Sequence, residues 1–326
     1  MAENKEKQDI SLPLVIVNPK SAGGNTGGRW AEIASDLATH FGAFETARTS
    51  YAGEATKIAE KATLSGRKFI IACGGDGTIN EVANGIIRAG AAAELGVMPA
   101  GTGGDFRRTL GMSSNSADAA RSLKYGITRA IDAGYVTYID PDGKDAGRYF
   151  LNVSSVGLSA SIIRRVKATH TLDWLPAAKL RGQANFALST LQEVLDLAPF
   201  KLKISIDDGE PRIIETINLS VANARYFGGG MKIAPEARLS DGKLDVTNIG
   251  DISTARILLN AYTLYAGTHL DLKEVKSRHV HSIEITPVDS SDAHAIEIDG
   301  ELPGKLPAKY EVIKHAIRVR VPRQRV

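Results

Sequence analysis

The stretch IIACGGDGTINEV, residues 70–82, decides the fold. A short apolar run leads directly into Gly74-Gly75-Asp76-Gly77-Thr78, and apolar residues then recur at helical spacing from Ile79. A strand that ends in a glycine-rich turn and passes into a helix is typical of a βα unit in a parallel sheet. Three glycines around one carboxylate allow phosphate and magnesium to approach the backbone closely. Asp76 has a simpler alternative role as the N-cap of the helix, because Asp is a preferred cap residue.

Two more glycine-rich loops follow apolar runs in the same half of the chain. NPKSAGGNTGG at 18–28 follows residues 14–17, and GVMPAGTGGDFRR at 96–108 carries a third glycine cluster before Asp105. The carboxyl ends of neighbouring parallel strands meet at one edge of a sheet, so these loops predict a nucleotide triphosphate site there. The site is not a P-loop, because Arg29-Trp30 stands where Lys and Ser or Thr are needed. The dinucleotide fingerprint is also incomplete, since Asn80 occupies its third glycine position.

The second half of the chain has a different pattern. Strand-like segments with period-two alternation lie at 201–206, 213–221, 244–249, 281–285 and 295–298, with helical stretches at 176–197 and 252–266. We therefore predict a two-domain α/β fold: a doubly wound α/β nucleotide-binding domain at 1–133 and an antiparallel β-sandwich at 134–309. A last strand at about 310–326 could close either domain.

Composition restricts the class of protein. The 326 residues carry 40 basic and 37 acidic side chains, a net charge of +3, which is too balanced for a protein that wraps nucleic acid. A single cysteine, Cys73, excludes an internal disulfide and indicates a reducing compartment. No signal peptide and no run of about 18 apolar residues is present, so we expect a cytoplasmic protein.

Several motifs together resemble the diacylglycerol kinase catalytic family, the soluble lipid kinases that include sphingosine and ceramide kinases. They stand in family order and cover nearly the whole chain: NPKSAGG at 18–24, GGDGTINEVANG at 74–85, PAGTGGDF at 99–106, NVSSVGLSA at 152–160, NARYFGGGMKIAPEARLSDGKLDV at 223–246 and EIDGE at 297–301. The resemblance implies an ATP- and Mg²⁺-dependent lipid kinase.

The resemblance also implies roles for individual residues. Glu301 would take the proton from the lipid hydroxyl, Asp299 would share or orient that role, and Asp76 would organise the catalytic Mg²⁺ through water. Asp105 and Asp132 match supporting acids near this network. A structural Mg²⁺ would be held by Arg238, Asp241 and Lys243, of which only Asp241 would use its side chain. Nucleotide contacts would come from Asn18, Thr49, Gly74, Gly75, Asp76, Gly77, Thr78, Ile79, Asn80 and Thr102.

The chain departs from the family at Gly104, where the third loop usually has Asn. The substrate is expected to be a diacylglycerol-like or sphingoid-type lipid at a membrane surface, which makes the protein peripheral at the membrane, and a homodimer is a possible assembly. The segment at 162–182 could contact anionic headgroups or be an ordinary amphipathic connector. The alternatives are an NAD kinase-type enzyme, which shares the GGDGT loop, and a non-catalytic lipid or nucleotide sensor on the same scaffold.

Overall fold

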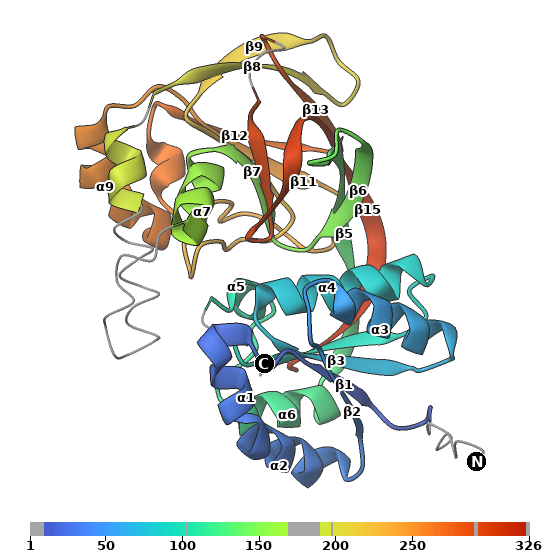
Figure 1. Ribbon diagram of the computed structural model, residues 1–326. Coiled ribbons are helices and arrows are strands. Elements are labelled where there is room, and N and C mark those ends of the chain that lie inside the picture. The colour runs from blue at the N-terminus through green and yellow to red at the C-terminus, as the bar shows by residue number, and fades with distance from the viewer. Residues whose placement is uncertain (1–9, 102, 169–189, 197, 290–292, 324–326) are drawn as a thin grey trace. The chain divides into compact units, whose positions relative to one another are not determined.

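Figure 1 shows the protein as a computed structural model, which describes residues 10–101, 103–168, 190–196, 198–289 and 293–323. The chain divides into two compact units. Unit 1 comprises Met1–Ala100, Gly111–Ala130 and Ile317–Val326, and unit 2 comprises Gly101–Leu110 and Ile131–Ala316. Within the described ranges, every helix is too short or too polar to cross a membrane.

Unit 1 is a parallel sheet with helices. Its strands are β1 (Leu14–Val17), β2 (Glu45–Arg48), β3 (Phe69–Gly74) and β4 (Glu94–Pro99), in the order β2-β1-β3-β4. The end of β15 (Glu301–Val321) pairs in parallel with β4. The helices of this unit are η1 (Ser21–Gly24), α1 (Asn25–Gly28), α2 (Trp30–Phe41), α3 (Glu54–Leu64), α4 (Asp76–Arg88) and α6 (Ser116–Tyr125). Every residue of β1 is buried, as expected for a parallel strand covered on both faces.

Local sequence explains where the helices of unit 1 begin and pack. The apolar residues Ile33 and Leu37, one helical turn apart, are the buried residues of α2. Asn115 caps α6, because its side-chain oxygen accepts a hydrogen bond from the backbone N–H of Asp118 at 3.1 Å. At Gly85, α4 comes so close to α3 that a Cβ would lie 2.3 Å from the carbonyl oxygen of Thr56. The glycine therefore sets the spacing of these two helices.

Unit 2 is built on antiparallel strands. These are β5 (Ile127–Ile139), whose first residues belong to unit 1, β6 (Asp145–Phe150), β7 (Val153–Gly157), β8 (Phe200–Ile206), β9 (Arg212–Thr216), β10 (Asn218–Ala222), β11 (Leu244–Ile249), β12 (Val275–Val280), β13 (Ser282–Pro287), β14 (Ala295–Ile298) and most of β15. Its helices are α5 (Asp105–Thr109), α7 (Leu158–Ala168), α9 (Thr254–Ala266) and η2 (His269–Asp271).

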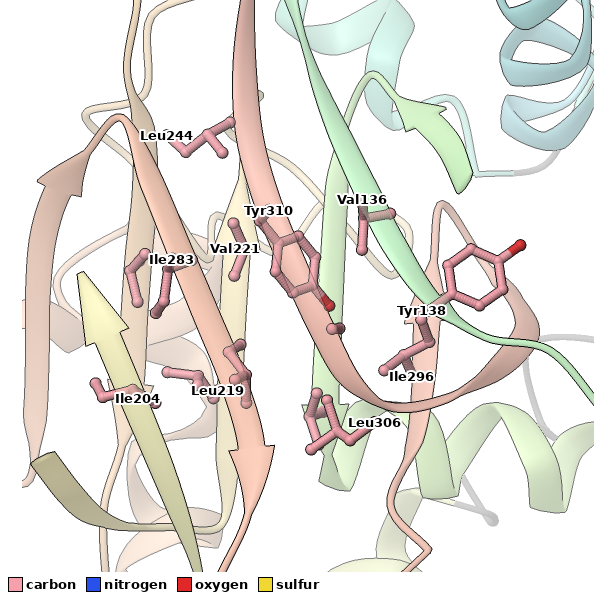
Figure 2. Close-up of a cluster of buried hydrophobic side chains, with 14 of the residues drawn as sticks. Val136, Tyr138, Ile204, Leu219, Val221, Leu244, Ile283, Ile296, Leu306 and Tyr310 are labelled. Atoms are coloured by element: carbon pink, nitrogen blue, oxygen red, sulfur yellow. The ribbon is translucent and has the colours of Figure 1, made fainter. Parts of the chain in front are cut away.

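The strands of unit 2 form two series that share β15. One series runs β12-β11-β10-β7-β14-β15, and the other joins β15 to β13, β8 and β9 and to β5 and β6. Apolar side chains from both series form one core, in which Tyr310 of β15 lies among side chains that include Val136, Val221 and Ile296 (Figure 2). The Tyr310 hydroxyl is satisfied by Ser154 Oγ at 3.0 Å. The structure therefore confirms the predicted two-domain α/β fold with an antiparallel sandwich.

One predicted strand is wrong in its extent. The run expected at 213–221 is two strands, because the chain changes partners at Ile217. β9 pairs with β8, whereas β10 pairs with β7 and β11. The apolar pattern runs through both strands, so only the tertiary structure reveals the break. The helix expected at 176–197 falls largely outside the described residues.

Candidate active site

The turn between β3 and α4 presents backbone at the end of a buried strand. Gly74 is the last residue of β3, Gly75 is the N-cap, and Asp76 is the first residue of α4. Asp76 is therefore not the N-cap, but it lies in the first turn, where the positive end of the helix dipole stabilises a carboxylate. Gly74 has no room for a side chain, since a Cβ would lie 2.5 Å from Thr78 Oγ1. Gly77, in the same first turn, is half-buried.

Not every predicted nucleotide contact in this turn is equally accessible. Gly75, Asp76 and Gly77 are half-buried, whereas Thr78, Ile79 and Asn80 are buried. Asn80 accepts hydrogen bonds from Asn84 Nδ2 at its backbone oxygen (2.9 Å) and its side-chain oxygen (3.1 Å). The groups that a ligand could reach from solvent are therefore those at the start of α4.

The loop after β1 lies beside this turn. Asn18 donates from Nδ2 to Thr78 Oγ1 at 3.1 Å, and its backbone N–H donates to the carbonyl oxygen of Cys73 at 3.0 Å. Further along the loop, Thr26 Oγ1 donates to the carbonyl oxygen of Ala100, just after β4, at 2.9 Å. The structure thus brings the segments after β1, β3 and β4 together at one edge of the sheet. Burial raises the pKa of the Cys73 thiol to about 12, so this cysteine is a core residue and not a nucleophile.

Thr49 follows β2 and is held against β1. Its backbone N–H donates to the carbonyl oxygen of Val17 at 2.9 Å, and the side chain is buried. The next turn leads into α3, whose N-terminal N–H groups need acceptors. Glu81 of α4 supplies them, because its carboxylate accepts from the backbone N–H groups of Gly53 (2.9 Å) and Ala55 (3.1 Å). Glu81 had no predicted role, although its place in GGDGTINEV is a signal for one.

The Asp299-Gly300 pair forms the turn between β14 and β15 in unit 2. Ile298 pairs with Glu301 across a two-residue loop, and both loop residues have positive φ, 46° and 87°. This is the geometry of a type I′ hairpin, for which Asp-Gly is a preferred sequence. The turn therefore fixes where the Glu301 side chain begins.

Asp299 is fully engaged by backbone. Its Oδ2 accepts from the N–H of Leu151 at 2.9 Å, and its Oδ1 accepts from those of Asn152 at 3.0 Å and Val153 at 3.1 Å. Burial raises the pKa of Asp299 to about 6, although the three backbone N–H groups and Arg148 act to lower it. The carboxylate joins the hairpin to the start of β7, at the predicted NVSSVG motif.

Glu301 differs from the other two acids of the EIDGE motif. Glu297 is buried and accepts from Ser155 Oγ and from the N–H of Gly300, each at 2.6 Å. The Glu301 side chain is 38% exposed and pairs through Oε2 with Arg148 Nη1 at 2.5 Å. Glu301 is thus the most exposed acid of this motif.

The two supporting acids bind backbone groups within unit 2. Asp105 accepts from Arg108 Nη1 and from the N–H of Gly229, both at 2.9 Å, and so connects the third glycine loop to the Gly228–Gly230 loop. Asp132 is buried and accepts from the N–H groups of Gly242 and His315, both at 2.7 Å. Both acids hold segments that are distant in sequence.

The three predicted structural-metal residues line one open pocket of about 460 Å³. Its lining residues are Arg225, Glu236, Arg238, Asp241, Lys243 and His279. Within the described ranges, no three Asp, Glu, His or Cys side chains are gathered as metal ligands. The carboxylate of Asp241 is a hard oxygen donor that suits Mg²⁺, and the remaining donors would be main-chain carbonyl oxygens, as the sequence analysis expected. Among the three predicted ligands, Asp241 is the one whose side chain suits Mg²⁺.

The predicted site residues divide between the two units. Thr102 and residues 169–182 of the segment at 162–182 lie outside the described residues. Asp76 and the residues of the first two loops belong to unit 1, whereas Asp105, Asp132, Asp299 and Glu301 belong to unit 2.

Two known family models match the chain and define its class. Residues 13–136 match the diacylglycerol kinase catalytic domain, and residues 152–321 match the YegS C-terminal NAD kinase beta sandwich-like domain. The chain is thus a two-domain enzyme of the lipid kinase class. It is 30% identical over 284 residues to a "Diacylglycerol kinase" of Bacillus subtilis (strain 168), covering 86% of each chain. These matches show that the chain belongs to the diacylglycerol kinase family.

Two further relatives agree with this family. A Pseudomonas aeruginosa (strain PAO1) protein named "Probable lipid kinase YegS-like" is 30% identical over 274 residues, which is 83% of this chain and 82% of the relative. A crystal structure from Bacillus anthracis str. Sterne superposes with a TM-score of 0.75 at 26% identity and covers 100% of both chains. A second crystal structure from that organism, named a diacylglycerol kinase, has a TM-score of 0.69 at 23% identity over 97% of this chain and 98% of the other, and shows the same fold.

Proposed function

We propose that the protein transfers the γ-phosphoryl group of ATP, with Mg²⁺, to the hydroxyl of a diacylglycerol-like or sphingoid-type lipid. The observation that carries the proposal is the difference between the three acids of the EIDGE motif. Glu297 and Asp299 are buried and accept hydrogen bonds from neighbouring groups, whereas Glu301 is partly exposed on a hairpin that both hold in place. A general base must reach the proton that it removes, so Glu301 is the base and Asp299 positions it.

In the proposed reaction the Glu301 carboxylate accepts the proton of the lipid hydroxyl. The lipid oxygen forms a bond to the γ-phosphorus as the bond between that phosphorus and the bridging oxygen breaks, and ADP leaves. Phosphoryl transfer asks the protein mainly to position these atoms and to offset negative charge. The half-buried backbone at Gly75, Asp76 and Gly77 and the loop containing Asn18 would hold the phosphates.

Magnesium belongs to the proposal in two places. When bound with ATP it would offset the charge of the phosphates, and Asp76 would hold it through water. A second ion would be bound by Asp241 with the main-chain oxygens of Arg238 and Lys243, where its role would be structural. Asp105 and Asp132 would act by holding the loops of unit 2 in position.

The test is transfer of labelled phosphate from ATP to a panel of lipids that includes diacylglycerol and a sphingoid alcohol. We expect transfer to at least one lipid, dependent on Mg²⁺ and lost in excess chelator. Glu301→Gln and Asp76→Asn should each lower turnover by roughly 10²-fold or more. Binding of ATP without transfer would overturn the proposal and favour a sensor, and transfer to NAD in place of lipid would favour an NAD kinase-type enzyme.

Matched controls separate chemistry from general damage. Glu311 lies on the same strand as Glu301, is partly exposed and is paired with Lys309 at 2.8 Å, so Glu311→Gln removes a comparable ion pair. Asp118→Asn is the control for Asp76→Asn, because Asp118 is exposed and lies in the first turn of α6 as Asp76 does in α4. Both controls should retain full turnover. If a control loses as much as its partner variant, the assigned roles are wrong.

A further inference from the structure

Arg148 occupies a core-facing position of strand β6. In this strand Ala146 and Phe150 pack in the core of unit 2, and Arg148 lies midway between them. Side chains alternate along a strand, so these three residues share one face. Arg148 is also directly opposite Val136 of β5, a buried core residue that Figure 2 labels. A charged side chain therefore stands where the alternation of the strand predicts an apolar one.

The burial of this guanidinium is unfavourable unless a partner offsets it. The Arg148 side chain is 15% exposed, so water can solvate little of it. A buried charge has to be paired, and well-packed apolar residues of similar volume are often as stable as a buried ion pair, or more stable. The stability of unit 2 therefore does not explain why an arginine occupies this position.

The partner of Arg148 is the proposed base. Arg148 Nη1 donates to Glu301 Oε2 at 2.5 Å. Strand β5 lies between β6 and β15 in the sheet, so this ion pair joins two strands that are about 10 Å apart. Within the described ranges, Oε1 of Glu301 has no hydrogen-bond partner. One carboxylate oxygen is thus held, and the other is left for a proton.

Arg148 also acts on Asp299, the other charged residue of the same hairpin. Burial raises the pKa of Asp299 to about 6, and the positive charge of Arg148 is among the influences that lower it. The guanidinium therefore serves both acids that flank Gly300.

We infer that Arg148 is a positioning residue, which holds the Glu301 carboxylate so that Oε1 is presented to the proton of the lipid hydroxyl. The inference rests on the proposed function, in which Glu301 is the general base. A general base acts only within hydrogen-bond reach of the proton that it removes. A misplacement of about 1 Å in an active site can cost about 10²-fold in rate. The ion pair across β5 removes that freedom from a long side chain.

The test compares the steady-state kinetics of single and double variants of the full chain in the lipid transfer assay. Arg148→Met should lower kcat by roughly 10- to 100-fold and change the KM for ATP and for lipid by less than about threefold. In a Glu301→Gln background the same change should lower kcat by less than about twofold further, because the base that Arg148 positions is then absent. Arg148→Lys keeps a cation and should recover part of the loss.

The matched control is Arg256→Met. Arg256 also belongs to unit 2 and pairs with Glu274 at 3.0 Å, away from the EIDGE motif, so its loss should leave kcat unchanged. Methionine suits the apolar row of β6, so Arg148→Met should unfold in urea at the midpoint of the parent or above it. A midpoint well below that of the parent would make Arg148 a stabilising residue and overturn the inference.

Crystal structures give a second readout that needs no catalysis. The Glu301 carboxylate should have one position in the parent and more than one in Arg148→Met, because a long side chain without its partner samples several rotamers.

Three other outcomes would overturn the inference. Arg148→Met could keep the full kcat, or it could lower kcat equally with and without Glu301. The Glu301 carboxylate could also keep its single position in the crystal structure of the variant. A parent that transfers phosphate to no lipid would refute the proposed function, and the crystal structures would still decide whether Arg148 positions Glu301.

Discussion

Replacing Asp299 by Ala should remove much of the stability of unit 2. The change leaves the backbone N–H groups of Leu151, Asn152 and Val153 without their acceptor, and the carboxylate that they contact is buried. Each unsatisfied buried N–H costs about 1–3 kcal/mol. Alanine at a positive φ of 46° adds about 1 kcal/mol. We therefore expect a loss of roughly 4–10 kcal/mol in the free energy of unfolding, against typical total stabilities of about 5–15 kcal/mol.

The control for this prediction is Asp207→Ala. Asp207 also has a positive φ, 49°, and its Oδ1 also accepts two backbone N–H groups, from His281 at 2.7 Å and Ser282 at 2.9 Å. Its side chain is 38% exposed, so water can replace the lost acceptor. The control should lose only about 1–2 kcal/mol, mostly from the backbone strain. Urea unfolding followed by circular dichroism measures both, and a difference of less than about 1 kcal/mol between the variants would refute the reasoning.

The remaining predictions concern two glycines and the pH dependence of folding. Gly85→Ala should destabilise unit 1 by roughly 2–4 kcal/mol in urea unfolding, because the new methyl group would meet the backbone of Thr56. The control is Gly28→Ala, which has open space at its Cβ and should change stability by less than about 1 kcal/mol. Gly104 has φ 66° and ψ 36°, a conformation that Asn tolerates, so the Gly104→Asn variant should fold normally. If the family's amide assists transfer, this variant should raise turnover tenfold or more, whereas Gly104→Ala should not raise turnover. The pKa of Asp299, raised to about 6 in the folded protein, means that the folded chain keeps a proton that the unfolded chain loses near pH 4. The contribution of Asp299 to stability should therefore fall by about 3 kcal/mol as the pH rises from about 4 to 6, and urea unfolding of Asp299→Asn should lack this slope.

Sequence reasoning succeeded where the signal was local. The apolar periodicity beginning at Ile79 predicted α4, and the alternation at 244–249 and 295–298 predicted β11 and β14. Each of these patterns is complete within one element, since a helix or strand has to bury one face. The glycine-rich turn at 74–78 likewise predicted, from its own residues, the passage from β3 to α4.

The rest depended on contacts between distant residues. Asp105 receives a hydrogen bond from Gly229 and Asp132 from His315, more than 120 and 180 positions further along the chain. No local pattern predicts such partners, so the sequence could assign these acids only by resemblance. The exposed face of α9, which carries Leu259 and Tyr262, is a second case, because periodicity predicts an apolar face but cannot say whether another part of the chain covers it.

The course of β15 affects how the protein can be made. Its first part pairs within the sandwich, and its final residues pair with β4, where Arg320 forms an ion pair with Glu94 at 2.5 Å. Unit 1 is therefore discontinuous in sequence, and its fifth parallel strand is synthesised last. During synthesis, one side of β4 lacks its strand partner until nearly the whole chain has left the ribosome. A chain ending at Ala316 would keep that edge of the sheet unpaired and prone to aggregation. Unit 1 thus completes its sheet only after the sandwich has been made.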